Sequence, residues 1–251
     1  MTLLPKKIYF ASDFHLGAPN AQESLKREKR IVAWLDQIKQ DAQEIYLVGD
    51  LFDFWFEYKH AIPKGFVRLQ GKIAELTDSG IPVHVFTGNH DMFIFDYIPK
   101  ELGVKIYREP IIREYNGKKF FIGHGDGLGP GDRKYKMIKW FFASKFCQWA
   151  YARIHPNLGL AFAFAWSRSS RKTNAGYDEK FHGEDKEFLV LFCKDYVKQD
   201  NSIDYFVFGH RHLPMEIKIN EKATYFNLGE WIKHNTYAVF DGEKLEMKEF
   251  K

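Results

Sequence analysis

The chain has 251 residues, of which 45% are hydrophobic, and its formal net charge is +4. This composition excludes a disordered, collagen-like or disulfide-stapled protein and provides enough apolar side chains for a large core. The charge is uneven, because residues 133–177 contain nine Lys or Arg and no Asp or Glu, so that this block carries +9 and the rest of the chain −5. A basic, aromatic-rich segment on a mildly acidic body indicates an anionic partner.

The N-terminus and the cysteines indicate the compartment. No apolar run near Met1 is long enough for a signal peptide. The longest charge-free stretch, residues 154–167, has 14 residues, whereas a spanning helix needs about 18–20 apolar residues. Cys147 and Cys193 lie in helical patterns, so free thiols are expected rather than a bridge. The sequence therefore predicts a cytoplasmic protein without a transmembrane segment.

The N-terminal part of the chain alternates β-rich runs with helical stretches. The pattern predicts, in chain order, a strand at 7–12, a helix at 22–40, a strand at 44–49, a helix at 63–79 and a strand at 82–88. The second helix has Pro63 at its opening and Gly80 just after its end, where these residue types are favoured. Strand–helix–strand repetition is typical of a layered α/β protein.

In the C-terminal part, the predicted strands follow one another at short spacing. Strands are predicted at 118–123 and 204–209, and four close-spaced strands follow at 215–220, 223–228, 235–240 and 244–250. The last four are joined by short turns, so we expect antiparallel hairpins that close a second sheet. Because no repeat or low-complexity linker interrupts the sequence, we expect a single domain, residues 1–251, with a helical lid inserted at residues 130–180.

Five predicted strands end in residue types that bind metals. The blocks are Asp13-Phe14-His15, Gly49-Asp50-Leu51-Phe52-Asp53, Gly88-Asn89-His90-Asp91, Gly123-His124 and Gly209-His210-Arg211-His212. Each block by itself is weak evidence for a metal site. Ligands of open α/β sheets bind at the carboxyl ends of strands, however, so five such blocks are expected to converge. Glycine beside each of the last four allows the sharp turns that this requires.

The donor set indicates the kind of centre. Carboxylates, imidazoles and one amide, without thiolate, suit Mn²⁺, Fe²⁺ or Zn²⁺ better than an all-oxygen Mg²⁺ or Ca²⁺ site. Seven donors exceed what one ion needs and suit two ions that share a carboxylate. Two ions about 3.5–4 Å apart can hold a hydroxide nucleophile and phosphoryl oxygens, which is the arrangement of phosphate-ester hydrolysis.

In order and spacing, over roughly residues 7–235, the five blocks resemble the signature of the calcineurin-like binuclear metallophosphoesterases. The resemblance implies an αββα sandwich with two metals that share Asp50. It implies one metal held by Asp13, His15, Asp50 and His212, and another held by Asp50, Asn89, His124 and His210. It also implies that Asp53 orients His90, which stabilises the transition state or protonates the leaving oxygen. Asn89, His90 and His210 would contact the substrate. Asp91 is expected to support a turn or cap a helix.

Within this superfamily, residues 50–55, residues 124–128 and the helical insertion resemble the UDP-2,3-diacylglucosamine diphosphatases of lipid A synthesis. The resemblance implies hydrolysis of a UDP-linked diacyl sugar to UMP and 2,3-diacylglucosamine 1-phosphate, with Asp132 contacting the substrate. Two departures indicate a divergent branch. His90 stands where familiar proteobacterial members have Arg, and residues 167–174 do not reproduce that family's Ser, Asn and Lys spacing.

The insertion has the chemistry that a lipid-linked substrate would need. Apolar residues at helical spacing in 137–150, and an apolar run at 158–166, could enclose acyl chains while Lys and Arg contact an anionic leaflet. Arg168, Arg171 and Lys172 are candidates for binding substrate phosphates. A guanidinium group can donate two parallel hydrogen bonds to two oxygens of one phosphate. The alternative is a set of ordinary cap helices packed on the body, with solvated cations.

Three functions follow from these patterns. The preferred one is a diphosphatase peripherally associated with the anionic inner leaflet of the inner membrane, using two Mn²⁺ ions, or Zn²⁺ or Fe²⁺, and needing neither nucleic acid nor an obligate protein partner. The second is a nuclease or phosphodiesterase whose basic, aromatic block binds nucleic acid. The third is a non-catalytic adaptor, although an adaptor would tolerate loss of ligands and here every ligand position is filled.

Overall fold

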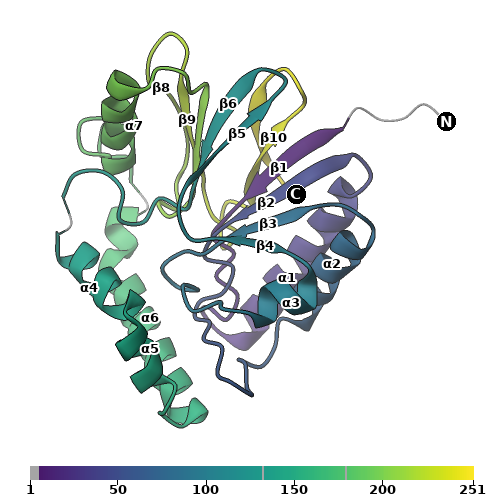
Figure 1. Ribbon diagram of the computed structural model, residues 1–251, viewed down its shortest axis with the longest axis vertical. Helices are drawn as coiled ribbons and strands as arrows, with labels where there is room; N and C mark the ends of the chain where they lie inside the picture. The colour runs from purple at the N-terminus through teal and green to yellow at the C-terminus, as the bar shows by residue number, and fades with distance from the viewer. Residues whose placement is uncertain (1–5, 132, 179) are drawn as a thin grey trace.

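The computed structural model describes residues 6–131, 133–178 and 180–251, and it describes the backbone without the side chains for 133–135 and 170–178. Two β-sheets lie face to face, and helices cover their outer faces (Figure 1). This is the mixed α/β sandwich that the sequence predicts.

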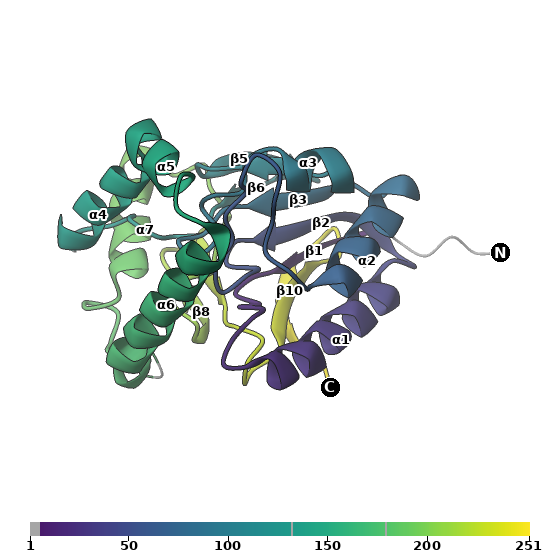
Figure 2. The ribbon, with the colours of Figure 1, turned by 90° about the horizontal axis from the view of Figure 1, so that it is seen from below.

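The first sheet has six strands in the order β11-β10-β1-β2-β3-β4. They are β1 (Lys7–Ala11), β2 (Ala42–Val48), β3 (Val83–Phe86), β4 (Lys105–Tyr107), β10 (Thr236–Phe240) and β11 (Leu245–Glu249). Strands β1 to β4 are parallel, and β10 and β11 pair antiparallel at one edge. Its outer face is covered by α1 (Ala21–Ile38), α2 (Val67–Asp78) and α3 (Tyr97–Leu102), as Figures 1 and 2 show.

The second sheet has five strands in the order β5-β6-β7-β9-β8. They are β5 (Ile111–Tyr115), β6 (Lys118–Ile122), β7 (Tyr205–Phe208), β8 (Pro214–Lys218) and β9 (Thr224–Leu228). Strands β6, β7 and β9 are parallel, with antiparallel strands at both edges. Helix α7 (Phe188–Gln199) packs on the outer face of this sheet.

Side chains that point alternately to the two faces of each strand form three buried layers. In β1, Tyr9 packs against the helices, while Ile8 and Phe10 face the second sheet. In β6, Phe120 lies in the same inter-sheet layer and Phe121 packs against α7. Because successive side chains point to opposite faces and both faces are covered, these strands consist largely of apolar residues.

Helices α4 (Arg133–Ala143), α5 (Lys145–Tyr151) and α6 (Pro156–Asp178) stand beside the two sheets, and we call them the α4–α6 segment (Figures 1 and 2). Ser144 ends α4 and caps α5, because its Oγ accepts the N–H of Cys147 at 3.2 Å. Trp140 and Phe146 are 74% and 73% exposed. The alternative of cap helices that pack their apolar faces on the body is therefore wrong for these side chains.

Some predictions about individual elements are wrong. The four C-terminal strands do not close one sheet, since β8 and β9 join the second sheet, while β10 pairs with β1 and β11 with β10 in the first. The second helix begins at Val67 rather than Pro63. The expected free thiols are confirmed at Cys147 and Cys193. Over the ranges that the structure describes, no helix is both long enough and apolar enough to cross a bilayer.

Candidate metal centre

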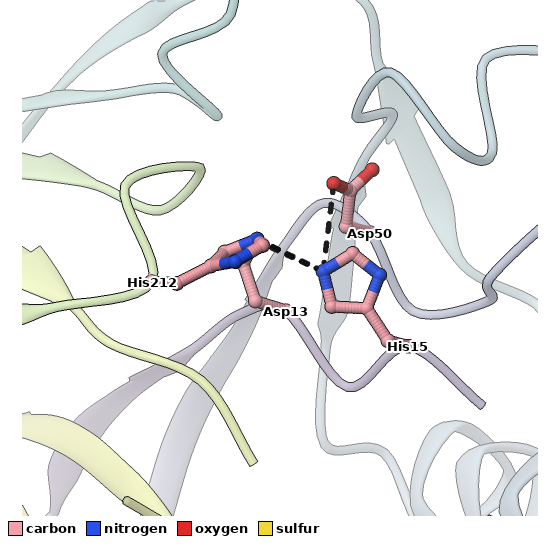
Figure 3. A group of neighbouring side chains, drawn as sticks. All are labelled: Asp13, His15, Asp50 and His212. Atoms are coloured by element: carbon pink, nitrogen blue, oxygen red, sulfur yellow. Dashed lines mark hydrogen bonds and ion pairs between the residues drawn. The ribbon is translucent and has the colours of Figure 1, made fainter. Parts of the chain in front are cut away.

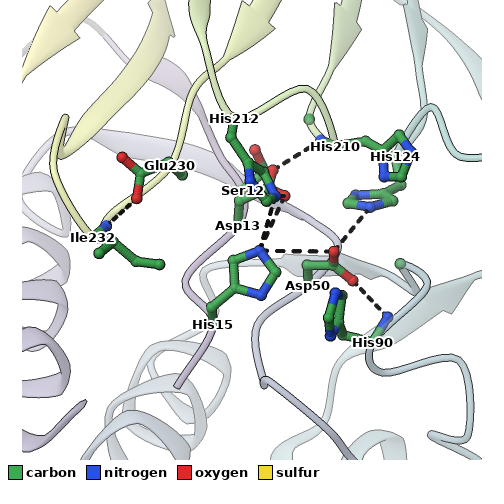
Figure 4. Close-up of polar contacts among 12 residues, drawn as sticks. Ser12, Asp13, His15, Asp50, His90, His124, His210, His212, Glu230 and Ile232 are labelled. Carbon is green, nitrogen blue, oxygen red and sulfur yellow. Dashed lines mark hydrogen bonds and ion pairs between the residues drawn. The ribbon is translucent and has the colours of Figure 1, made fainter. Parts of the chain in front are cut away.

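The five metal-binding blocks follow the carboxyl ends of β1, β2, β3, β6 and β7. The first three of these strands are parallel neighbours in one sheet, and the last two are parallel neighbours in the other. Parallel strands end at the same edge of a sheet, and the two sheets face each other, so the five loops meet at one place (Figure 4). The convergence that the sequence predicts is therefore present.

One group of side chains contains Asp13, His15, Asp50 and His212, whose ligand atoms all lie within 4.8 Å of one another (Figure 3). His15 Nε2 lies 3.0 Å from His212 Nε2 and 3.6 Å from Asp13 Oδ1. The same nitrogen is 3.9 Å from Asp50 Oδ2. Asp13, His15 and Asp50 are buried, and the His212 side chain is 22% exposed, so the group opens to solvent on the His212 side.

A second group contains Asp50, His124 and His210. His124 Nε2 lies 3.3 Å from Asp50 Oδ2, and His124 Nδ1 lies 2.8 Å from the backbone oxygen of Val48. A carbonyl oxygen accepts hydrogen bonds, so Nδ1 carries the proton that it donates to Val48, and Nε2 is the ring nitrogen that faces the centre. Asp50 belongs to both groups, as expected of a bridging ligand.

Buried polar atoms that complete no hydrogen bond gather at this centre. Among the described residues, these atoms include Asp13 Oδ1, Asp50 Oδ2, Asn89 Oδ1 and His124 Nε2. Leaving such a group unsatisfied costs about 1–3 kcal/mol. The atoms belong to carboxylate, amide and imidazole groups, which are the donors that divalent transition metals accept. The residues present therefore fit a centre that holds divalent cations.

The ionisation states of the buried groups suit metal binding. Burial would raise the pKa values of Asp13 and Asp50, but neighbouring histidines outweigh it and hold both well below their usual range. Burial lowers the pKa of His15 to about 3 and, together with the charge of His124, that of His210 to about 4. At neutral pH these four side chains are ionised carboxylates and neutral imidazoles, the forms that coordinate cations.

His124 has the opposite shift. Burial lowers its pKa, but the negative charge of Asp50 outweighs burial and raises that pKa well above the usual value. Its Nε2 proton would have to leave before this nitrogen could coordinate a cation.

The backbone around the centre is strained. Among the residues that the structure describes, eight that are not glycine have φ values in the left-handed region. Five of them are predicted ligands, namely Asp13, His15, Asp50, His210 and His212. Such conformations are uncommon for side chains with a Cβ atom and gather at functional sites.

Glycines let the loops approach one another closely. A Cβ atom on Gly209 would lie 2.4 Å from Asp13 Oδ2, and one on Gly88 would lie 2.2 Å from Asp50 Oδ1. Neither glycine has a positive φ, whereas Gly49 does, at 85°. The sequence assigned all of these glycines to sharp turns, but at positions 88 and 209 their role is to leave space beside a carboxylate.

Asp91 supports the turns that carry the ligands, as the sequence predicts. Its Oδ2 accepts the N–H of Leu51 and its Oδ1 accepts the N–H of Gly88, both at 2.7 Å. Burial and the nearby charge of Asp50 raise the pKa of Asp91 to about 7. Asp91 therefore ties the loop after β2 to the loop after β3.

His90 lies beside the first group of ligands. Its backbone N–H donates to Asp50 Oδ1 at 2.9 Å (Figure 4), and its ring stands edge-on to that of His15. Its Nδ1 lies 2.8 Å from the backbone oxygen of Asp53, whereas the Asp53 carboxylate is 3.9 Å away. Asp53 therefore makes its hydrogen bond to the His90 ring through its main-chain oxygen.

The predicted substrate contacts in the insertion are described in part. Arg168 is exposed on α6. Asp132 and the side chains of Arg171 and Lys172 lie outside the described residues. A residue that sequence reasoning missed is Ser167, which is 4% exposed and donates from Oγ to Asp53 Oδ1 at 3.0 Å. A serine within a helical run gives no signal of such a contact.

Two cations of the basic block hold the α4–α6 segment to the body. Lys139 Nζ lies 2.7 Å from Asp126 Oδ2, and Lys136 Nζ donates to the backbone oxygen of Gly129 at 2.6 Å. Arg153 lies over the Trp149 ring, 5.2 Å from its centroid. Part of the +9 charge of this block therefore serves attachment and internal packing.

The chain is similar to several known hydrolases. Residues 6–214 match the family model described as calcineurin-like phosphoesterase. A UDP-2,3-diacylglucosamine hydrolase from Porphyromonas gingivalis is 36% identical over 253 residues, which cover 96% of this chain and 97% of that protein. A protein of the same name from Vibrio atlanticus is 26% identical and covers 96% of each chain. The solved structure of Yfce, a phosphoesterase from E. coli, aligns at 17% identity over 98% of this chain and 93% of that one, with a TM-score of 0.49.

The family model covers most of the chain, and the relatives align along nearly their whole length. The fold is a mixed α/β sandwich, and the residues at its centre fit divalent cations. The chain therefore belongs to the calcineurin-like phosphoesterase family and is a metal-dependent hydrolase.

Proposed function

We propose that this protein hydrolyses the pyrophosphate bond of UDP-2,3-diacylglucosamine, giving UMP and 2,3-diacylglucosamine 1-phosphate for lipid A synthesis. The observation that carries the proposal is a phosphoesterase centre beside a segment whose exposed side chains are aromatic and aliphatic. A substrate with phosphates at one end and acyl chains at the other matches both. The names of the full-length relatives support the same substrate.

The proposed centre holds two divalent ions. In this proposal the ligands of one ion are Asp13, His15, Asp50 and His212, and those of the other are Asp50, Asn89, His124 and His210. Mn²⁺ is the proposed metal, with Zn²⁺ or Fe²⁺ as alternatives, because the donors mix carboxylates, imidazoles and an amide. When bound, such a pair supplies a hydroxide nucleophile and offsets negative charge on the phosphoryl oxygens.

His90 is the proposed catalytic residue of this chain. Its Nδ1 hydrogen is engaged by the backbone oxygen of Asp53, so Nε2 is the nitrogen that faces the substrate. With a second proton on Nε2, the imidazolium can donate to the phosphoryl group or the leaving oxygen. Asn89 and His210 would contact the same group. Asp132, Arg168, Arg171 and Lys172 are proposed to bind the rest of the substrate, the cations by pairing with its phosphates.

Residues 130–180 are proposed to act as a lid within a single domain that spans residues 1–251. On α6, Leu158, Phe162 and Trp166 are 68%, 64% and 57% exposed. Burying these side chains against acyl chains or lipid would be favourable, and nearby cations would attract an anionic surface. The proposed location is therefore the cytoplasmic face of the inner membrane, with peripheral attachment and without an obligate protein partner.

The test offers three substrates to the Mn²⁺-loaded protein. UMP release is measured with UDP-2,3-diacylglucosamine in detergent micelles, beside incubations with single-stranded DNA and a soluble nitrophenyl phosphodiester. UMP release far faster than either control reaction supports the proposal. DNA cleavage at a comparable rate would identify a nuclease, and no hydrolysis of any substrate would identify an adaptor.

Two substitutions test the roles of the residues. Asp50→Ala should abolish turnover and reduce bound metal, because Asp50 is the ligand that both groups share. His90→Ala should lower kcat about 10²- to 10⁴-fold, the usual contribution of a general acid, while bound metal measured by atomic emission stays unchanged. Metal loss in His90→Ala would show that its role is structural.

A further inference from the structure

We propose that Ser167 is a positioning residue for His90, so that the α4–α6 segment takes part in aligning the catalytic imidazole. The inference rests on the role proposed above for His90. It concerns a contact between two parts of the chain that are 77 residues apart in sequence.

Ser167 differs from its neighbours on α6 in its burial. It is 4% exposed, whereas Trp166 is 57% exposed and Arg168 is also exposed. The hydroxyl points from this otherwise exposed stretch of helix to the metal centre. Its Oγ lies 3.0 Å from Asp53 Oδ1 and 3.4 Å from His90 Nδ1.

The positions of the protons follow from the partners. The Asp53 backbone oxygen can only accept, so at 2.8 Å His90 Nδ1 must carry the hydrogen. The Ser167 hydroxyl has one proton, which it donates to the Asp53 carboxylate. Its lone pairs then face the His90 N–H, which is shared between the Asp53 backbone oxygen and Ser167 Oγ. This arrangement holds one hydrogen on Nδ1 and turns Nε2 towards the substrate, where the second hydrogen of an imidazolium would be the one donated.

The two acceptors of the His90 proton belong to different parts of the molecule. The Asp53 oxygen lies in the loop after β2, whereas Ser167 Oγ belongs to α6. A displacement of α6 would move the Ser167 hydroxyl away. His90 Nδ1–H would then lose one of its acceptors, and the Asp53 carboxylate would lose the hydrogen bond that Ser167 donates. His90 would then sample other ring orientations, and even a displacement of about 1 Å can cost up to a hundredfold in rate. The position of the α4–α6 segment is therefore coupled to the turnover step.

The first test is a double-mutant cycle with Ser167→Ala, His90→Ala and the combined variant, assayed on the nitrophenyl phosphodiester and on the lipid substrate. Ser167→Ala is expected to lower kcat about tenfold, with KM and bound metal unchanged. In the His90→Ala background, Ser167→Ala should cause no further loss of kcat, because Ser167 affects turnover through the His90 ring. Ser167→Thr, which keeps the hydroxyl, should restore kcat. Additive losses, or a change confined to KM, would overturn the inference.

The second test does not depend on turnover, so it distinguishes failure of this inference from failure of the proposed substrate. In ¹⁵N-histidine-labelled protein, the His90 Nδ1–H signal is identified by its loss in His90→Ala. Ser167→Ala should make this proton exchange faster with water and give ¹⁵N shifts of mixed tautomers. Ser169→Ala, at an exposed position of the same helix, should leave the signal unchanged. A His90 signal that is identical in Ser167→Ala and wild type refutes the positioning role.

Discussion

At the residue scale, the centre holds its ligands in conformations that are unfavourable in isolation. Left-handed backbone at Asp13, His15, Asp50, His210 and His212 costs of order 1–3 kcal/mol for each residue. Several buried ligand atoms also lack hydrogen-bond partners among the described residues. Cations bound there would offset both costs, so folding and metal binding are thermodynamically linked.

This linkage predicts a stability change on metal removal. A chelator should lower the Tm of the protein by about 5–10 °C relative to a sample with Mn²⁺ at a hundred times its Kd, since such binding adds about 2.7 kcal/mol. Differential scanning calorimetry measures the shift. The Tm of Asp50→Ala should depend much less on Mn²⁺. An equal Tm shift in that variant would show that the stabilising ion binds elsewhere.

The close approach at Gly209 predicts opposite effects for the same substitution at two glycines. Gly209→Ala should reduce bound metal and kcat, because the new methyl group would lie 2.4 Å from Asp13 Oδ2 and 2.6 Å from Ser12 Oγ. Gly71→Ala is the control, since Gly71 lies within α2 with nothing within 4 Å of its Cβ position. It should add about 0.5–1 kcal/mol to the free energy of unfolding. Normal metal content in Gly209→Ala would contradict the close approach.

At the scale of elements, α2 shows why sequence rules for helix ends can fail. Pro63 predicts a start at 63, but the helix starts at Val67, after Phe66 in a left-handed conformation. Phe66 offers no capping side chain, and Glu28 of α1 supplies the cap instead. Its Oε1 accepts the N–H groups of Arg68 and Leu69 at 2.8 and 3.1 Å. A cap from another helix leaves no local signal in the sequence.

The cap supplied by Glu28 predicts a measurable loss of stability. Glu28→Ala should lower the free energy of unfolding by about 1–2 kcal/mol, because it removes the acceptor for two N–H groups at the N-terminus of α2. Urea denaturation measures the change. Glu23→Ala, at an exposed position in the first turn of the same α1 helix, is the matched control and should stay within about 0.5 kcal/mol of wild type. Equal losses in both variants would show that the cap does not contribute.

At the scale of the whole molecule, a polar cluster joins the two sheets away from the metal centre. Glu44 on β2 accepts hydrogen bonds from Tyr115 of the second sheet at 2.7 Å and from Tyr46 at 3.0 Å. His84 Nε2 lies 3.0 Å from the same carboxylate. Burial would raise the pKa of Glu44, but these contacts outweigh it and hold the pKa at about 2. The ionised carboxylate therefore links the sheets.

The lowered pKa of Glu44 gives a stability contribution that depends on pH. Its folded pKa of about 2 lies below the ordinary value of 4.5, so the contribution is present above pH 4.5 and is lost as pH falls towards 2. Glu44→Gln should thus be less stable than wild type at pH 7, and the difference in Tm should shrink between pH 4.5 and 2. A difference that stays constant over this range would rule out the ionised carboxylate as its source.

The exposed aromatic residues of the α4–α6 segment predict binding to lipid. The double substitution Trp140→Ser with Phe146→Ser should weaken binding to phosphatidylglycerol-containing vesicles by about tenfold or more, since each side chain loses its apolar contact with the bilayer. Vesicle sedimentation measures this. Val67→Ser on α2, at a residue that is 71% exposed on the body, is the control and should leave binding unchanged. Unchanged binding by the double variant would mean that this segment does not face the membrane.

The layered α/β fold and the strand ends that bear metal-binding residue types can both be predicted from the amino-acid sequence. Both follow from local patterns, because side-chain alternation defines a strand and a short motif at its end keeps its spacing in any environment. No local pattern predicts three other features: the pairing of β10 with β1, the cap that α1 supplies to α2, and the contact between Ser167 and Asp53. Each depends on residues far apart in the chain, and such pairings are selected by burial and hydrogen bonding after the elements pack together.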